Sequence, residues 1–310
     1  MQAIAIERCG GVEHLALMEL PLPQPGAEEI LVRVRAAGVN LVDTMYREGY
    51  GQNESFPRIM GSDFAGEVVQ IGREVTAFVV GDEVFGYKLG GNGTYAQYAT
   101  VPAAYAAKKP TSLDFIHAAA LPCVGLTAYE ALVETLKVMA GETLLITSAA
   151  GGVGSVAVQV AADLGIRVIA TASARNREYL HALGATEVID YQTEDFVQAV
   201  RAFYPNGIDV VLTCIAGETK QRCPDVLRDG GRFAWISGEE RLGPPMQRLI
   251  QGTYSGGRPD SGVLTTLAHL VDQRRLQVSI EEVFPLEQAA KAHTRIEEGH
   301  VRGKLVVSVP

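Results

Sequence analysis

Short apolar runs alternate with helical segments through the second half of the chain. The runs predict strands at residues 143–147, 167–171, 186–190, 208–213 and 232–237, and the helical segments between them end in glycine-rich turns. Runs without a polar face are typical of strands that are buried on both sides of a parallel sheet. The pattern therefore predicts a doubly wound α/β domain, in which ligands bind beyond the carboxyl ends of the strands.

The first 120 residues have a different pattern, in which Val-rich alternation is interrupted by Gly and Pro at short intervals. This pattern predicts short strands in a small barrel-like domain. Helices are expected at 113–121, 269–277 and 284–299, and a final strand at 303–309. Because that final strand is isolated from the parallel set, we expect it to return to the N-terminal domain.

The strongest chemical signal lies in the segment 143–165, where a strand, a glycine cluster and a helix from Ser155 follow one another. Gly151 and Gly154 match the second and third glycines of the dinucleotide-binding fingerprint, and Ala149 replaces the first. A pyrophosphate would then lie against the backbone at Gly151 and the helix N-terminus. The alternative is a glycine-rich turn without a ligand. The expected phosphate-binding residues are Ala150, Gly151, Gly152, Val153 and Gly154.

The residues after the second strand distinguish between the two nicotinamide dinucleotides. An acid there would accept hydrogen bonds from a ribose 2′-OH, but this chain has Ser173, Arg175 and Arg177 before its first acid, Glu178. A hydroxyl and a guanidinium would instead bind a 2′-phosphate, so the sequence predicts NADP(H). The alternative is that both arginines belong to a solvated helix start. The expected strand-end residues near the cofactor are Cys214, Ser237 and Gly238.

Composition narrows the class of protein. Of 310 residues, 47% are hydrophobic, and the formal net charge of −9 disfavours nucleic acid and anionic membranes as partners. The chain contains neither a recognisable secretory signal nor a run of 18 apolar residues, so we expect a cytoplasmic protein. The four cysteines have no spacing typical of metal ligands and are expected to be reduced thiols.

Seven segments spread over the chain resemble the medium-chain dehydrogenase/reductase superfamily, and within it the zinc-independent quinone oxidoreductases, the ζ-crystallin-like group. They lie at 36–51, 60–72, 81–86, 121–132, 141–159, 184–191 and 303–307. The resemblance implies a GroES-like β-barrel catalytic domain, 1–121 with 257–310, and a Rossmann NADP-binding domain, 122–256. It also implies NADPH-dependent transfer of hydride or electrons to a quinone or a similar conjugated carbonyl acceptor.

The zinc-dependent alcohol dehydrogenases of this superfamily differ at the metal ligands. They have Cys at the position of Asn40, and Gly-His-Glu where this chain has Gly61, Ser62 and Asp63. Asn and Ser are poor zinc ligands, so we expect no bound zinc. Without a metal nothing lowers the pKa of an alcohol substrate, which favours an acceptor that is already electrophilic.

The resemblance also implies roles for individual residues. Asn40 would lie beside the nicotinamide in the cleft between the domains, and Tyr46 would contact substrate or relay a proton. Tyr50 is a weaker substrate candidate, and Asp43 a structural partner of this loop. Thr127 would contact the nicotinamide ribose or phosphate. For both Tyr46 and Thr127 a role in packing alone is the alternative.

Three further implications concern the cofactor and assembly. Tyr191 would complete the 2′-phosphate pocket with Ser173 and Arg175, and Lys304 would lie near the cofactor, unless it is an edge-strand charge. Relatives pair the edge strands of their nucleotide domains, so we expect a homodimer in which the segment 250–257 is the edge strand.

Four other functions stay open at this stage. The chain could be an NADPH-dependent alkenal or enoyl reductase, a non-catalytic NADPH-binding protein, a zinc dehydrogenase with unusual ligands, or a purely structural protein. The first alternative differs from a quinone oxidoreductase only in the acceptor that it reduces. The other three differ from it in catalysis or in metal content.

Overall fold

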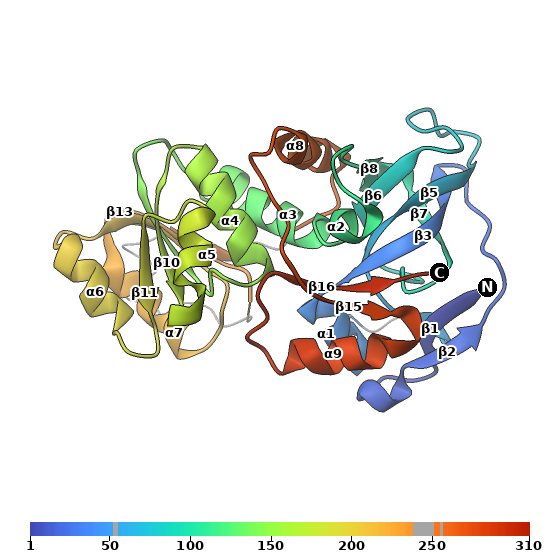
Figure 1. Cartoon of the computed structure of the whole chain (residues 1–310), viewed down its shortest axis with the longest axis horizontal. Helices are drawn as coiled ribbons and strands as arrows, with labels where there is room; N and C mark the ends of the chain where they lie inside the picture. Colours follow the sequence, from blue (N-terminus) through green and yellow to red (C-terminus); the bar gives the residue numbers. More distant parts are fainter. Residues whose placement is uncertain (52–54, 238–250, 255–256) are drawn as a thin grey trace. The chain divides into compact units, whose positions relative to one another are not determined.

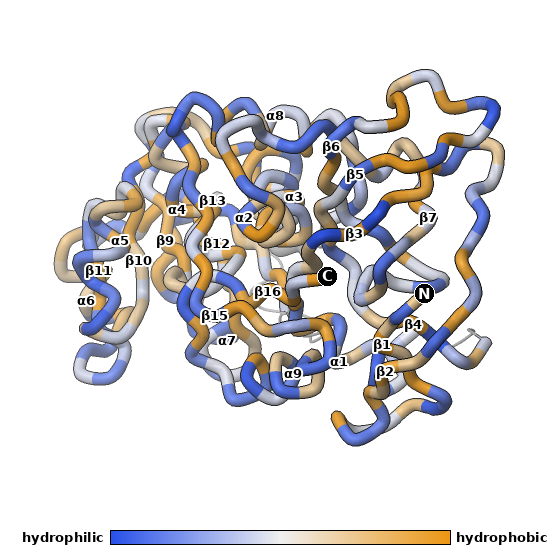
Figure 2. Tube along the Cα trace, turned by 45° about the vertical axis from the view of Figure 1, so that its right-hand side comes forward, coloured by the Kyte–Doolittle hydropathy of each residue, from blue (hydrophilic) through white to orange (hydrophobic). Residues whose placement is uncertain are grey.

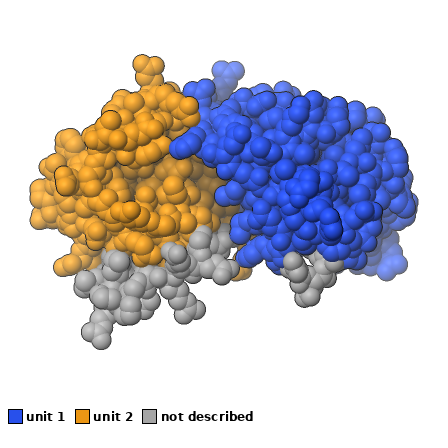
Figure 3. Space-filling model, turned by 90° about the horizontal axis from the view of Figure 1, so that it is seen from below, with its two compact units in different colours: residues 1–126, 259–310 blue, residues 127–258 orange. Residues whose placement is uncertain are grey.

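The computed structural model describes all residues of the chain except 52–54, 238–250 and 255–256. Contacts divide the chain into two compact units, shown in different colours in Figure 3. One unit comprises Met1–Leu126 and Pro259–Pro310, and the other Thr127–Arg258. The corresponding boundaries expected from the sequence were 121/122 and 256/257. No helix in the described part of the chain is long and apolar enough to cross a membrane.

The described residues of the unit 127–258 form a parallel sheet of six strands (Figure 1). The strands are β9 (Thr143–Thr147), β10 (Arg167–Ala172), β11 (Glu187–Asp190), β12 (Ile208–Thr213), β13 (Leu227–Trp235) and β14 (Gln251–Tyr254). Their spatial order is β11-β10-β9-β12-β13-β14. The order reverses between β9 and β12, which is the Rossmann arrangement. The structure thus confirms the predicted α/β fold with a parallel sheet.

Six described helical elements of this unit come after a strand of the sheet. They are α4 (Gly152–Asp163), η4 (Ala174–Asn176), α5 (Arg177–Ala182), α6 (Phe196–Phe203), α7 (Glu218–Arg222) and η5 (Cys223–Val226). All five residues of β9 are buried, and the hydrophobic colouring follows β9 and β10 in Figure 2. Phe196 and Val200 of α6 pack in one cluster with Leu145 and Val211 of the sheet. The sheet and this helix therefore share one apolar core.

The other unit is built on two sheets. In its described residues, β1 (Gln2–Ile6) pairs with β2 (Ala16–Glu19) and β4 (Arg58–Ile59). The larger sheet has the order β15-β16-β3-β5-β6-β8, with β7 also paired to β3. Its strands are β3 (Glu29–Val39), β5 (Asp63–Ile71), β6 (Glu83–Tyr87), β7 (Tyr98–Pro102), β8 (Ala106–Lys108), β15 (Ile280–Pro285) and β16 (Lys304–Ser308).

The last strand of the chain joins the N-terminal part, as the sequence predicts. β16 runs antiparallel to β3, with Leu305 opposite Val39 and Val306 opposite Gly38. A Cβ on Gly38 would lie 2.5 Å from the Ala119 carbonyl oxygen and 2.7 Å from Asp63 Oδ2. The absence of a side chain at position 38 therefore lets Asp63 and a helix approach the end of β3.

The unit with the two sheets also contains helical elements, and the last of its first segment, α3, continues past residue 126 into the unit 127–258. The elements are η1 (Val12–His14), α1 (Leu41–Glu48), η2 (Ala103–Tyr105), α2 (Phe115–Ala119), α3 (Pro122–Tyr129), α8 (Ser261–Asp272), η7 (Leu286–Gln288) and α9 (Ala289–Glu297). Immediately after α3, η3 (Glu130–Thr135) is a π-helix.

Several predicted boundaries were wrong. The helix expected at 269–277 is α8, which begins at Ser261 because the Asp260 carboxylate accepts hydrogen bonds from the backbone N–H groups of Gly262 and Val263. The helix expected at 284–299 begins at Ala289, because the residues up to Pro285 pair with β16 as strand β15. α4 begins at Gly152 rather than Ser155, and β13 ends at Trp235 rather than at residue 237.

Candidate functional site

The turn between β9 and α4 has the geometry of a phosphate cradle. Gly151 is the N-cap of α4, and no acidic side chain lies in the first turn of this helix. A Cβ on Gly154 would lie 2.5 Å from the Ser148 carbonyl oxygen and 2.7 Å from Ala149 Cα, so only glycine lets the helix pack so closely. A Cβ on Gly151 would have its nearest neighbour at 3.5 Å. The turn therefore presents helix N–H groups, with which an anion can bond.

The structure brings two of the expected adenosine-side residues to neighbouring strand ends. Ser173 follows β10 directly, and the backbone N–H of Tyr191 donates to the carbonyl of Ala172 at 3.3 Å. Ser173 Oγ also accepts from Asn176 Nδ2 at 3.3 Å. Arg175 and Tyr191 are exposed. Their location, without an acid between 173 and 177, suits a ribose that carries a phosphate.

Further along the sheet, Cys214 and Ser237 follow β12 and β13. The Cys214 N–H donates to Thr147 Oγ1 at 3.2 Å, which ties it to the end of β9. Burial raises the pKa of the Cys214 thiol to about 12, so this thiol stays protonated. Ser237 Oγ is buried and has no hydrogen-bond partner within the described ranges. Such an orphaned hydroxyl fits a site whose ligand supplies the missing partner. Gly238 lies outside the described residues.

The phosphate cradle, the strand ends and the orphaned hydroxyl of Ser237 together suit a bound dinucleotide. Each feature belongs to the unit 127–258, and each offers hydrogen-bond donors where a nucleotide offers phosphate and ribose oxygens. The residues in question are those from 150 to 154, Ser173, Arg175, Tyr191 and Ser237.

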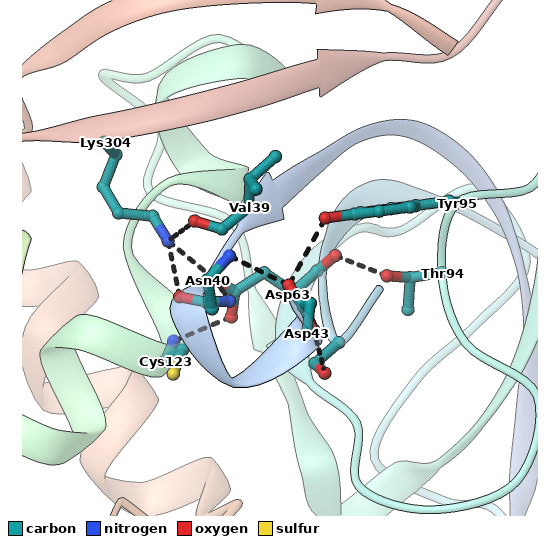
Figure 4. Close-up of polar contacts among 9 residues, drawn as sticks. Val39, Asn40, Asp43, Asp63, Thr94, Tyr95, Cys123 and Lys304 are labelled. Atoms are coloured by element: carbon teal, nitrogen blue, oxygen red, sulfur yellow. Dashed lines mark hydrogen bonds and ion pairs between the residues drawn. The ribbon is translucent and has the colours of Figure 1, made fainter. Parts of the chain in front are cut away.

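The other unit contains a buried polar network at the junction of β3 and α1 (Figure 4). Asn40 is the N-cap of α1, and its Nδ2 donates to Asp63 Oδ2 at 2.9 Å. Lys304 Nζ, from the first residue of β16, donates to Asn40 Oδ1 at 2.6 Å and to the Val39 carbonyl at 2.7 Å. It also lies 3.5 Å from Asp63 Oδ2. All three side chains are almost completely buried. Asn40 and Lys304, predicted separately, therefore lie in contact.

Asp43 holds the start of α1 from the opposite side of this network. It accepts hydrogen bonds from the Asn40 N–H at 2.9 Å, Ser62 Oγ at 2.7 Å and Tyr95 Oη at 3.3 Å. Burial raises the pKa of Asp43 to about 6, although the hydrogen bonds oppose this. These contacts suit the structural role that the sequence suggested for Asp43.

Asp63 has two further hydrogen-bond partners besides Asn40 and Lys304. The backbone N–H of Cys123 donates to its Oδ1 at 2.8 Å, and Thr94 Oγ1 donates to its carbonyl oxygen at 2.7 Å. Burial raises the pKa of Asp63, while the Lys304 charge acts in the opposite direction. Sequence reasoning noted Asp63 and Ser62 as replacements of metal ligands but missed their role, and it missed Tyr95 and Thr94 altogether.

The remaining predicted residues have the following surroundings. The Tyr46 and Tyr50 rings lie 6.0 Å apart, and the Arg58 guanidinium lies 5.2 Å from the Tyr46 ring centre. Tyr50 is half exposed. Tyr46 is partly buried, and this burial raises the pKa of its hydroxyl. Thr127 Oγ1 is buried and accepts from the Gly257 N–H at 3.3 Å. The hydroxyl of Thr127 therefore has a structural partner within its own unit.

Comparison with known proteins agrees with this architecture. The family model described as "Alcohol dehydrogenase GroES-like domain" matches residues 26–111, and the one described as "Zinc-binding dehydrogenase" matches 183–307. A quinone oxidoreductase of Pseudomonas aeruginosa is 31% identical, and the alignment covers 96% of each chain.

Two solved structures are similar over the full fold. A protein described as an NAD-dependent alcohol dehydrogenase has a TM-score of 0.93 and 31% identity, with complete coverage of both chains. The quinone oxidoreductase of Escherichia coli, solved in complex with NADPH, has a TM-score of 0.89 and 27% identity, covering 99% of this chain and 100% of that one.

The fold and the two sets of residues thus define an oxidoreductase with a GroES-like and a Rossmann-like part. The chain belongs to the medium-chain dehydrogenase/reductase superfamily, and within it to the quinone oxidoreductase group. The resemblance inferred from the sequence is confirmed.

Proposed function

We propose that the protein is an NADPH-dependent oxidoreductase that reduces a quinone or a similar conjugated carbonyl compound without zinc. The observation that carries this proposal is the buried Asn40 amide, which Lys304 and Asp63 hold where zinc-dependent relatives have a metal ligand. The relatives named as quinone oxidoreductases, one of them complexed with NADPH, support the same acceptor and cofactor.

The residues of the unit 127–258 hold the cofactor in this proposal. The N–H groups at the start of α4 bind the pyrophosphate, and Ser173, Arg175 and Tyr191 bind the 2′-phosphate and its ribose. Ser237 donates its hydroxyl, which has no partner among the described residues, to the nucleotide. NADPH bound there supplies a hydride from its nicotinamide ring.

The residues of the other unit act on the acceptor. Reduction places negative charge on the carbonyl oxygen, and a fixed N–H of Asn40 stabilises that charge by donating to it. The aromatic faces of Tyr46 and Tyr50 offer a flat apolar contact to a ring-shaped acceptor. Because burial raises the pKa of Tyr46, its hydroxyl stays protonated and can donate a hydrogen bond.

The positive charge of Lys304 supports the proposal that no zinc is bound at Asn40. The Lys304 ammonium lies 2.6 Å from Asn40 Oδ1, the side chain at the metal-ligand position, and would repel a metal ion there. Neither Asn40 nor Ser62 offers the charged or soft ligand that zinc prefers.

The decisive experiment compares acceptors under identical conditions. Initial rates of NADPH oxidation are measured with 1,4-benzoquinone, 9,10-phenanthrenequinone and 2-hexenal. We expect kcat/KM to be at least tenfold higher for a quinone than for 2-hexenal. Turnover of 2-hexenal alone would assign the protein to enone reduction, and binding without turnover of any acceptor would leave a non-catalytic NADPH-binding protein.

We also propose a homodimer that forms through strand β14. Among the described residues β14 is the last strand in the order of the parallel sheet, and an unpaired sheet edge offers N–H and C=O groups to another chain. Sedimentation velocity over a hundredfold range of concentration would show a dimer. A monomer at every concentration would refute this assembly.

A further inference from the structure

We propose that Lys304 is a positioning residue, which fixes the orientation of the Asn40 side chain so that the amide offers an N–H rather than its carbonyl oxygen to the acceptor. This inference rests on the proposed function, because Asn40 is the group assigned there to the acceptor oxygen. It gives Lys304 a role other than the cofactor contact expected from the family resemblance.

The three hydrogens of the Lys304 ammonium all have acceptors inside its own unit. The acceptors are the Val39 carbonyl at 2.7 Å, Asn40 Oδ1 at 2.6 Å and Asp63 Oδ2 at 3.5 Å. An ammonium group has three donors and no acceptor. Lys304 would therefore have to give up one of these bonds in order to bind a nucleotide.

The partners of Asn40 allow one orientation of its amide. Oδ1 faces the ammonium, and Nδ2 faces the Asp63 carboxylate at 2.9 Å. Rotating the amide by half a turn would place Oδ1 against the carboxylate and Nδ2 against the ammonium, and both contacts would be repulsive. Nδ2 carries two hydrogens, and the second has no acceptor within the described ranges. This second hydrogen is the donor available to an acceptor oxygen.

The backbone holds Lys304 in place independently of its side chain. Gly303 has a φ of +73°, and a Cβ there would lie 2.2 Å from the Ser279 carbonyl oxygen. The Lys304 N–H donates to that same carbonyl at 2.9 Å, and Leu305 pairs with Val39. The first residue of β16 thus brings the ammonium to Asn40 and Val39, and Figure 4 shows these contacts.

The ion pair also strengthens the amide as a donor. The positive charge of Lys304 Nζ beside Oδ1 polarises the amide and makes its N–H groups better donors, most strongly where water is excluded. Asp63 compensates the charge of Lys304, and no proton needs to move between them. The electrostatic effect of the lysine therefore reaches the acceptor through Asn40.

A double-mutant cycle tests this coupling. We expect Lys304→Met to lower the kcat for quinone reduction by 10- to 100-fold, while the KM for the quinone and the Kd for NADPH change less than threefold. Asn40→Ala should lower kcat by a similar factor, and the double variant should be no slower than Asn40→Ala alone. A further tenfold loss in the double variant, or a raised Kd with unchanged kcat, would overturn the proposal.

Lys304→Met leaves the buried Asp63 carboxylate without a counter-charge, so the fold is checked by thermal melting. If this variant does not fold, Lys304→Met is combined with Asp63→Asn, which removes both charges of the pair and keeps the net charge. Because Asp63 also accepts from Asn40 Nδ2, the single variant Asp63→Asn is measured beside it, and only the additional loss of kcat is assigned to Lys304. Lys108→Met is the matched control, since Lys108 forms an exposed pair with Asp82 in the same unit. The control should keep kcat within twofold.

A second readout needs no substrate. The Asn40 side-chain amide gives a pair of signals in a ¹H–¹⁵N spectrum, which are assigned by their loss in Asn40→Ala. Lys304→Met should shift these signals, and Lys108→Met should not. If the wild type reduces no quinone but the signals shift, the proposed function fails and the positioning role stands. If the wild type reduces quinones but neither the signals nor kcat respond, the positioning role fails.

Discussion

At the scale of single residues, His293 of α9 is a buried base whose pKa is strongly lowered. Its ring is fully buried, with Arg47 Nη1 3.3 Å from Nδ1 and the Tyr95 ring centre 5.8 Å away. Because arginine can only donate, Nδ1 accepts and Nε2 carries the hydrogen. Arg47 also pairs with Glu48 and Glu297. Burial and the Arg47 charge lower the pKa of His293 to about 3.

The folded protein must therefore keep His293 neutral in acid. The unfolded chain binds a proton at this residue below pH 6.5, and the folded chain does so only near pH 3. Its contribution to stability is complete above pH 6.5 and falls towards pH 3 by about 1.4 kcal/mol per pH unit. The raised pKa of Asp43 acts in the opposite sense between pH 4 and 6. The comparison of a variant with the wild type separates the two.

We predict that His293→Gln removes the contribution of His293 to the pH dependence of stability. Urea unfolding at pH 7, 5.5 and 4.5 should show a free energy of unfolding that falls less steeply with acid in the variant than in the wild type. His117→Gln is the control, because His117 is exposed and pairs with Asp114 on the surface. Parallel pH profiles for His293→Gln and wild type would contradict the prediction.

A second prediction concerns the affinity of the Arg175→Ala variant for NADPH. Removing a guanidinium from a phosphate costs about 1.5–3 kcal/mol, which is roughly a 10- to 100-fold loss of affinity. Fluorescence titration of Arg175→Ala should show that loss for NADPH and no loss for NADH. Arg177→Ala serves as control, since Arg177 donates to the Val188 carbonyl. Equal losses for both nucleotides would argue against a 2′-phosphate contact.

The sequence could identify Asn40, Gly151 and Arg175 as candidates because each belongs to a local motif. The contact between Lys304 and Asn40 could not be predicted in this way, since 264 positions separate the two residues. Such a contact depends on the antiparallel pairing of β16 with β3, which the pattern of apolar residues indicated without a register.

At the scale of elements, the turn between β9 and α4 contains two glycines with different expected roles. Gly154 allows close packing of the helix, and Gly151 is expected to contact the ligand. We predict that Gly154→Ala destabilises the fold by about 2 kcal/mol, because the added Cβ would collide with the Ser148 and Ala149 backbone. Gly151→Ala should cost less than about 1 kcal/mol, since its nearest neighbour lies at 3.5 Å. Thermal melting measures both.

Nucleotide binding should reverse this ranking. A Cβ at position 151 has no protein atom closer than 3.5 Å, and the proposal places the pyrophosphate against this residue, so we expect Gly151→Ala to raise the Kd for NADPH at least tenfold while the fold is kept. If Gly151→Ala binds NADPH as the wild type does, the pyrophosphate does not lie against this residue.

Element types were predicted more reliably than element ends. The run of β9 is fully buried and that of β12 almost so, which leaves no ambiguity of face, and the bounds of both strands match the predicted ones. The beginning of the helix predicted at 284–299 was wrong because strand β15 and helix α9 are both partly apolar and are separated only by the short turn η7. The pairing with β16 that distinguishes them is a tertiary interaction.

At the scale of the whole molecule, both architectures were predictable from the sequence, one from alternating strands and helices and the other from dense glycine and proline punctuation. The strand order of the parallel sheet follows from the connection rules of doubly wound folds. The cytoplasmic location, the dimer and the absence of nucleic-acid or membrane partners stay predictions.

Independence from zinc is a prediction at this scale. Because Lys304 supplies a positive charge beside Asn40, treatment with a strong chelator should leave quinone reduction unchanged within about 10%. Elemental analysis should find well below one zinc per chain. Loss of activity that added zinc restores would contradict the account, and a zinc-dependent alcohol dehydrogenase treated in parallel shows that the chelator is effective.

The central claim is that one chain binds NADPH and passes reducing equivalents to a quinone. The most direct measurement is a fluorescence titration of metal-free protein with NADPH and NADH, followed by addition of 9,10-phenanthrenequinone to the protein–NADPH complex. We predict tighter binding of NADPH than of NADH, and oxidation of the bound nucleotide in a single turnover. A protein that binds neither nucleotide, or that keeps NADPH reduced in the presence of every quinone tested, would contradict the account.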